Sequence, residues 1–239
     1  MPPQTPAPGV VMLHGSEGGT EPFLPEFAAE LSKQGFVVVT LCWFGCQGTP
    51  DRVLRVPLDR VTEVGNWLSE APEVRGGVGL FGWSRGGEAA VLVTSLLADT
   101  KPYRAVAVHA PSDTIVASFD PKTQDSVFET SAQTGRTVPA PAWTWKGQDL
   151  FGEPTTDFRT PGPRIVVEKY PGPVYVSAGE RDEIWEVGRS RRIVSARATV
   201  PSLVTQSHFW PGEGHVLSTA SAAKQHAEIA TFFKTHLAL

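Results

Sequence analysis

A serine set between glycines is the pattern in this sequence that most directly indicates covalent chemistry. The segment GWSRG at 82–86 matches G-x-S-x-G, and the apolar run VGLF at 78–81 precedes it. In a tight strand-to-helix turn of this type the serine hydroxyl projects over the sheet edge, and small residues two positions away avoid a clash. A purely structural turn is the alternative, which the apolar flanks disfavour. The pattern therefore predicts that Ser84 is a nucleophile.

A serine nucleophile also needs donors that stabilise negative charge on a carbonyl oxygen. A helix that begins after Ser84 aims its N-terminal N–H groups at that oxygen, so the Arg85 backbone N–H is the first predicted donor. The second is expected from the loop HGSEGG at 14–19, through the N–H of Ser16 or Glu17. This loop lacks the G-x-x-x-x-G-K-[ST] pattern of a phosphate-binding loop, and His14 is interpreted as a packing residue.

An acid that orients a catalytic histidine is expected just beyond the end of a strand. The strand-like segment VYVSAG at 174–179 is followed by ERDE at 180–183, in which Asp182 is the predicted acid. Glu180 and Glu183 remain alternatives, and a solvated charge cluster without a catalytic role is the other interpretation.

The histidine base is expected after the acid along the chain. His215 ends the segment GEGH at 212–215, just before the last predicted helix, and is the predicted base. His208 lies in the strand-like segment SHFW, so packing is its predicted role. His109 ends another strand and is a candidate pocket residue, although a buried, hydrogen-bonded histidine is the commoner case.

The elements that must position these residues alternate between short apolar runs and amphipathic segments. This pattern predicts an α/β protein with a mainly parallel central sheet flanked by helices. The predicted strands are 10–14, 36–41, 77–81, 105–109 and 174–178, and the predicted helices are 26–34, 58–70, 88–98 and 220–237. Segment 111–163 has no regular pattern, and such a long irregular insertion is usually a functional lid. We expect a single domain over 1–239 with a cap at 111–163.

Aromatic side chains are frequent in this predicted cap. They can line a substrate pocket or anchor the cap to the core. We expect an apolar pocket formed by Trp143 and Trp145, with Phe151 and Phe158 as further cap aromatics and with His109 and Trp83 below them.

The composition excludes several classes of function. The 25 acidic and 21 basic residues give a net charge of −4 without a basic run, so neither nucleic acid nor an anionic membrane is an expected partner. The longest apolar stretch, 36–44, is too short to span a bilayer, and the first residues lack a signal pattern, so a cytoplasmic location is expected. The scattered histidines predict no metal, and the chemistry needs no cofactor. Cys42 and Cys46 are interpreted as packing thiols.

Several of these segments resemble one family. The segments are Gly18-Gly19, EFAAELSKQGFVVVT at 26–40, residues 58–94 with the notable segment VGLFGWSRGGEAAVLVTS, AWTWKG at 142–147 and GERDEIW at 179–185. They are similar to the catalytic domain shared by acyl-CoA thioesterases and bile acid-CoA:amino acid N-acyltransferases. That domain is close to the dienelactone hydrolases. The resemblance covers most of the chain and implies an α/β-hydrolase fold, with Ser84, Asp182 and His215 at the positions of the nucleophile, acid and base. Because some members carry cysteine where this chain has Ser84, it also implies hydrolysis rather than conjugation to an amino acid.

The expected function is therefore hydrolysis of a small-molecule carboxylic ester or thioester through an acyl-enzyme. A dienelactone hydrolase or a peptidase is the alternative among enzymes. A non-catalytic ligand-binding protein that keeps the fold is the alternative from another class, since one scaffold hosts many chemistries.

Overall fold

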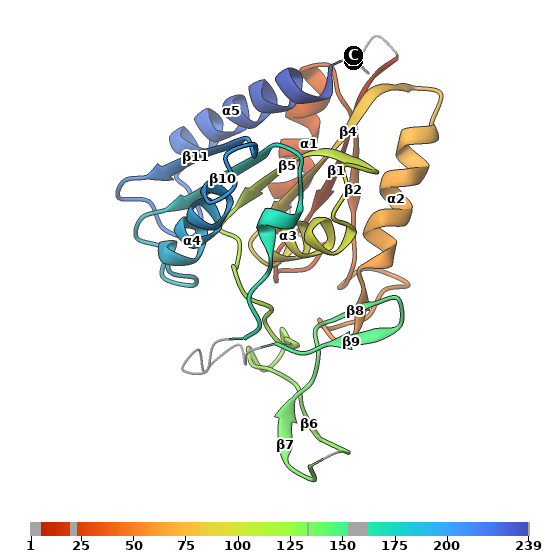
Figure 1. Cartoon of the computed structure of the whole chain (residues 1–239), viewed down its shortest axis with the longest axis vertical. Coiled ribbons are helices and arrows are strands. Elements are labelled where there is room, and N and C mark those ends of the chain that lie inside the picture. The colour runs from red at the N-terminus through yellow and green to blue at the C-terminus, as the bar shows by residue number, and fades with distance from the viewer. Residues whose placement is uncertain (1–5, 20–22, 133, 153–161, 239) are drawn as a thin grey trace.

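A six-stranded sheet forms the centre of the computed structural model, which describes residues 6–19, 23–132, 134–152 and 162–238 (Figure 1). Its strand order is β11-β10-β5-β4-β1-β2, and every neighbouring pair is parallel. The predicted parallel sheet is confirmed. The strands are β1 (Ala7–Leu13), β2 (Val37–Leu41), β4 (Val74–Trp83), β5 (Tyr103–His109), β10 (Val174–Gly179) and β11 (Thr205–Trp210).

Helices cover both faces of this sheet, which explains the apolar runs within its inner strands β1, β4, β5 and β10. Successive side chains of β1 point to opposite faces, so Val10 and Met12 join one core cluster while Val11 and Leu13 join the other. The first cluster is closed by α1 (Phe23–Lys33) and α5 (Thr219–Leu237). The second is closed by α2 (Asp59–Glu70), α3 (Arg85–Leu97) and α4 (Val187–Ala198). None of the helices described combines the length and apolar character that a bilayer crossing requires.

Helix α4 is the main element that the sequence pattern does not predict. Its buried positions include two arginines, Arg189 and Arg197, so the apolar stripe of an ordinary amphipathic helix is missing. The Arg197 guanidinium instead donates hydrogen bonds to the carbonyl oxygens of Val167, Tyr170 and Gly172 at 2.7–2.9 Å. Burial lowers the pKa of Arg197 to about 10, which leaves it charged at neutral pH. A buried polar face therefore replaces the expected apolar one.

The segment between β5 and β10 contains short strands rather than a wholly irregular chain. The strands β6 (Phe128–Thr130) and β7 (Thr137–Pro139) form a hairpin that extends away from the sheet at the lower end of Figure 1. The strands β8 (Trp143–Trp145) and β9 (Gln148–Leu150) form a second hairpin, and β8 pairs with β3 (Val56–Pro57). A 3-10 turn, η1 (Val167–Lys169), precedes β10. Residues 133 and 153–161 of the predicted cap lie outside the described residues.

Candidate active site

The turn between β4 and α3 holds Ser84 in an unusual backbone conformation, with φ 53° and ψ −117°. A non-glycine residue at positive φ is uncommon, and such strain clusters at functional sites. The Ser84 N–H donates to the carbonyl oxygen of His109 on β5 at 2.8 Å. A Cβ atom at Gly82 would collide with the carbonyl oxygen of Gly86, and one at Gly86 would collide with that of His14. Both glycines of the motif are thus required by packing.

Ser84, His215 and Asp182 form one continuous line of hydrogen bonds. Ser84 Oγ lies 2.9 Å from His215 Nε2, and His215 Nδ1 lies 2.8 Å from Asp182 Oδ2. Asp182 Oδ1 accepts the backbone N–H groups of Ile184 and Trp185 at 2.9 and 2.8 Å. The serine is 5% exposed, the histidine 3%, and the aspartate side chain 0%. This geometry can pass the serine proton to the imidazole and hold the resulting positive charge beside a fixed carboxylate.

The other candidate acids, Glu180 and Glu183, and the other candidate histidine, His208, make contacts of a different kind. Glu180 forms an exposed ion pair, with 2.7 Å between its Oε1 and Arg191 Nη2. Glu183 contacts the backbone rather than the imidazole, because its Oε2 accepts the N–H of His215 at 3.2 Å. His208 lies 3.0 Å from the carboxylate of Glu228 on α5. Among the predicted candidates, Asp182 and His215 are the ones that the fold brings to Ser84.

His109 is buried beneath the loop that carries His215, and its ring contacts the backbone of that loop. Its Nε2–H donates to the carbonyl oxygen of His215 at 3.2 Å, while its Nδ1 lies 3.0 Å from Ser177 Oγ and 2.6 Å from Gln225 Nε2. Burial lowers the pKa of His109 to about 4, with a smaller opposing effect from the bond to His215. The structure therefore places this residue as a buried, neutral, hydrogen-bonded histidine.

The three predicted oxyanion donors all lie at one cavity with the serine. Ser16, Glu17 and Arg85 line it together with Ser84. The loop that carries the first two is held in shape by its own side chain, because Glu17 Oε1 accepts the Gly15 N–H at 2.8 Å. The choice between the Ser16 and Glu17 N–H groups stays a prediction.

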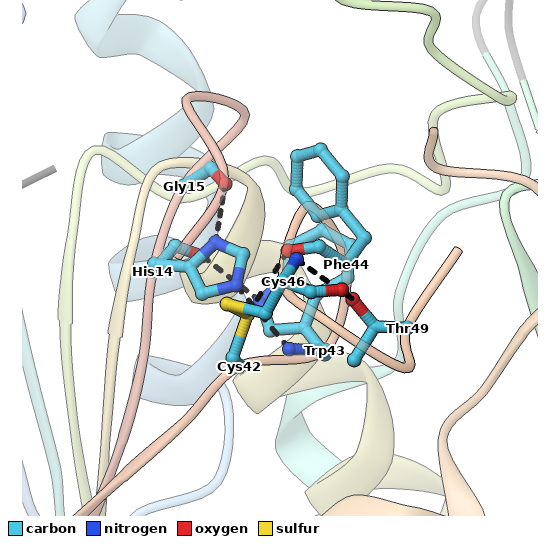
Figure 2. Close-up of a disulfide and its surroundings, with 7 residues drawn as sticks. All are labelled: His14, Gly15, Cys42, Trp43, Phe44, Cys46 and Thr49. Atoms are coloured by element: carbon cyan, nitrogen blue, oxygen red, sulfur yellow. Dashed lines mark hydrogen bonds between the residues drawn. A yellow bond between two sulfur atoms is a disulfide. The ribbon is translucent and has the colours of Figure 1, made fainter. Parts of the chain in front are cut away.

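His14 joins this loop to the segment after β2, as Figure 2 shows. The His14 Nδ1–H donates to the carbonyl oxygen of Gly15 at 2.9 Å, which leaves Nε2 to accept the backbone N–H of Trp43 at 3.3 Å. The Trp43 indole N–H returns a bond to the His14 carbonyl oxygen at 3.1 Å, and the two rings stack at 4.9 Å. Burial lowers the pKa of His14 to about 4. Its place is that of a packing residue.

A disulfide between Cys42 and Cys46 supports the same loop, so the interpretation of these cysteines as packing thiols is wrong (Figure 2). The chain turns back sharply after β2, where the Gly45 N–H donates to the carbonyl oxygen of Pro50 at 2.8 Å. That turn brings the two Cα atoms to 6.3 Å, within reach of a disulfide. Gly19 rests directly on the bridge, because a Cβ atom there would collide with both sulfur atoms.

The two buried histidines predict a loss of stability in mild acid. Both have a folded-state pKa near 4, below the ordinary value of about 6.5, so the unfolded chain takes up protons that the folded chain does not. The titration of these histidines does not affect the free energy of unfolding above pH 6.5. That free energy falls as the pH drops from 6.5 toward 4, by at most about 3 kcal/mol for each histidine. Urea unfolding at several pH values between 7.5 and 4.5 measures this loss.

Single variants separate this effect from the titration of carboxylates. We expect His14→Gln to flatten the dependence of unfolding free energy on pH, whereas Asn66→Gln, which changes no titratable group at an exposed position on α2, leaves it unchanged. An equal slope in wild type and His14→Gln would contradict the prediction.

The cavity over Ser84 has a volume of about 510 Å³ and a largely apolar wall. Ile184 and Val216 are 56% and 63% exposed at its rim, so they are available to a ligand. Sequence reasoning missed most of this wall, although Ile184 and Trp185 directly follow the acidic segment. The apolar lining residues are Trp83, Phe119, Ile184, Trp185 and Val216.

Three of the four residues predicted to form the pocket, Trp143, Trp145 and His109, are not among the lining residues of this cavity. Trp143 is 1% exposed, and its indole N–H donates to Glu88 Oε1 at 2.8 Å, so it anchors the segment to the core. Trp145 packs at the edge of the same core cluster. Phe151 is exposed, and Phe158 lies outside the described residues. Of the aromatic residues predicted, Trp83 lines the cavity.

Glu88 on α3 binds the segment after β5 to the helix that carries the serine. Its buried carboxylate accepts hydrogen bonds from Arg85 Nη1 (2.9 Å), the Val116 N–H (2.9 Å) and the Trp143 indole (2.8 Å). Arg85 Nη2 also donates to the carbonyl oxygen of Ala117. Burial raises the pKa of the Glu88 carboxyl, and the charge of Arg85 opposes that shift. The segment after β5 and helix α3 thus share one buried polar contact.

A parallel sheet with helices on both faces and a strained serine turn at its carboxyl edge define the α/β-hydrolase class. Residues 10–229 match the model of the Alpha/beta hydrolase family, and the chain belongs to this family.

Known relatives agree with the resemblance noted in the sequence. The chain is 36% identical to human Acyl-coenzyme A thioesterase 1 over 99 residues, which are 41% of this chain and 23% of that protein. It is 28% identical to rat Acyl-coenzyme A amino acid N-acyltransferase 2 over 191 residues, which are 76% of this chain and 42% of that protein. The chain therefore spans less than half the length of either relative.

A solved structure shows the same fold with little sequence identity. The structure of Est1E from Butyrivibrio proteoclasticus with ferulic acid bound superposes with a TM-score of 0.65 at 16% identity. The superposition covers 96% of this chain and 89% of that one.

Proposed function

We propose that this protein is a serine hydrolase that cleaves carboxylic esters or thioesters through an acyl-enzyme. The observation that carries the proposal is the buried line from Ser84 Oγ through the His215 imidazole to the Asp182 carboxylate, with 2.9 and 2.8 Å between the successive polar atoms. A structural serine needs neither a positive φ nor a shielded imidazole–carboxylate pair beside it.

In the first half-reaction His215 Nε2 takes the proton of Ser84 as Oγ attacks the acyl carbonyl. The oxyanion accepts hydrogen bonds from the Arg85 N–H and from an N–H of Ser16 or Glu17. Asp182 keeps the Nδ1–H tautomer in place and stabilises the imidazolium. The imidazolium then protonates the leaving alkoxide or thiolate, and in the second half-reaction the imidazole activates water that releases the acid.

The lining of the cavity over Ser84 favours a substrate that carries an apolar group next to its reacting carbonyl. The cavity wall includes two indoles, one phenyl ring and two aliphatic side chains, and such surfaces bind acyl or aryl groups by excluding water. Similarity to acyl-CoA thioesterases supports a thioester among the substrates. An ester and a thioester of the same acid give the same acyl-enzyme once the alkoxide or thiolate has left.

Labelling with a fluorophosphonate probe tests the proposal, because the probe reacts with an activated serine. We expect one probe per chain by intact mass, and peptide mapping that locates it on Ser84. We also expect turnover of p-nitrophenyl esters that depends on acyl chain length. Folded protein that is neither labelled nor active, or that is labelled at another serine, would exclude this mechanism.

A further inference from the structure

A second cavity, of about 240 Å³, lies behind the catalytic one, and we call it the rear cavity. It lies between α1, the start of α5 and the carboxyl ends of β4 and β5. Its wall is formed on one side by the α1 residues Glu26 and Glu30, and on the other by Ala222 and Ala223 of α5. Buried His109 is among its lining residues. Nothing in the proposed chemistry uses this space.

The rear cavity adjoins the catalytic cavity. Trp83 and Val216 line both, so the indole and the valine side chain form the boundary between them. Trp83 precedes the nucleophile and Val216 follows the base, and the Trp83 and His215 rings are 5.8 Å apart. An arm of a substrate bound at Ser84 would have to pass these two side chains to reach the rear cavity.

The charges at the rear cavity are negative. Glu26 and Glu30 are carboxylates at exposed positions, and the described lining residues include neither lysine nor arginine. Burial lowers the pKa of His109 to about 4, so its ring is neutral at neutral pH. Burial also lowers the pKa of His226, and the Glu30 carboxylate, whose Oε2 lies 2.6 Å from His226 Nδ1, opposes that shift. The site would repel a carboxylate or phosphate, and it would tolerate or attract an ammonium group.

We propose that the rear cavity receives one arm of the substrate, an apolar chain that ends in an uncharged or ammonium group and not in an anion. This inference rests on the proposed hydrolase function and adds the substrate class to it. The alanines of α5 and the Trp83 indole contact the chain, and the carboxylates of α1 face its end.

Filling the rear cavity tests this assignment. Ala222→Phe places a phenyl ring in the cavity, and Ala227→Phe is the matched control, because Ala227 is exposed on the same helix and lines neither cavity. Substrates are p-nitrophenyl acetate, longer p-nitrophenyl esters, and acetates of the corresponding long alcohols. We expect Ala222→Phe to lower kcat/KM at least about tenfold for the longer members of one series, since several methylene contacts are lost. Hydrolysis of p-nitrophenyl acetate and fluorophosphonate labelling should stay unchanged.

Charge at the chain end provides the second readout. With arms of equal length, wild type should prefer methyl and ammonium ends over carboxylate ends, and Glu26→Gln/Glu30→Gln should reduce that preference. If Ala222→Phe affects neither long series, or carboxylate ends are hydrolysed as well as methyl ends, the rear-cavity assignment is overturned while hydrolysis of the acetate still supports the hydrolase. Absence of both labelling and acetate turnover in wild type would overturn the two proposals together.

Discussion

Replacement of Ser84 by alanine is expected to lower kcat for ester hydrolysis by roughly 10⁶-fold, the loss seen when the nucleophile of a serine–histidine–acid site is removed. The Ser84 hydroxyl is the atom that must bond to the acyl carbon, and the imidazole and the backbone donors cannot replace it. The substitution removes one oxygen whose hydrogen bond is to His215 Nε2, so the fold should be retained. Steady-state kinetics with a p-nitrophenyl ester, together with circular dichroism, measures both results.

Ser95→Ala is the matched control, because Ser95 lies on the same helix and its hydroxyl donates to the carbonyl oxygen of Leu92 at 2.8 Å. We expect it to keep wild-type kcat. If folded Ser84→Ala retained more than a tenth of wild-type kcat, Ser84 would not be the nucleophile.

Glu88→Ala is expected to produce the largest loss of stability among single substitutions at the site. It leaves the Arg85 guanidinium, the Val116 N–H and the Trp143 indole N–H without the carboxylate that they share in the interior. Removing one partner of a buried ion pair costs about 3–5 kcal/mol. For a chain of this length that corresponds to a fall in Tm of about 6–20 °C. Thermal and urea unfolding measure this change.

Glu63→Ala on α2 is the control, since Glu63 is exposed and its replacement should change the unfolding free energy by less than about 0.5 kcal/mol. Replacing both charged partners, as in Arg85→Met/Glu88→Leu, should recover part of the loss, because no buried charge then stands alone. A Tm for Glu88→Ala equal to that of Glu63→Ala would show that the buried contact does not hold the segment.

The sheet and the serine turn could be predicted because their signals are local. The strands of a covered parallel sheet are apolar on both faces, and the segment before Ser84 shows this without reference to any other part of the chain. The turn itself is encoded by Gly82 and Gly86, which lie within two residues of the serine. The predicted helix at 88–98 begins three residues later than α3, whose first turn contains Gly86 and Gly87, residues of low helix propensity.

Two features that sequence reasoning missed, the role of Trp143 and helix α4, depend on partners far along the chain. Trp143 packs its segment against the core instead of lining the substrate cavity, because Glu88, 55 residues earlier, accepts a hydrogen bond from its indole N–H. Helix α4 escaped prediction because Arg197 on its buried face is satisfied by carbonyl groups of the η1 segment. The bridge between Cys42 and Cys46 depends on a reversal of the chain after β2, which neither composition nor cysteine number reveals.

The packing of Gly86 against the His14 carbonyl oxygen has an evolutionary consequence. Helix α3 and the loop before Ser16 touch backbone to backbone. Any side chain larger than hydrogen at position 86 would therefore force the helix or the loop to move. In a deep mutational scan scored on activity, Gly82 and Gly86 would tolerate as few substitutions as Ser84, although neither glycine supplies a reacting group. A parallel scan scored on protein abundance would separate them, because the glycines fail in both screens and the serine fails in one.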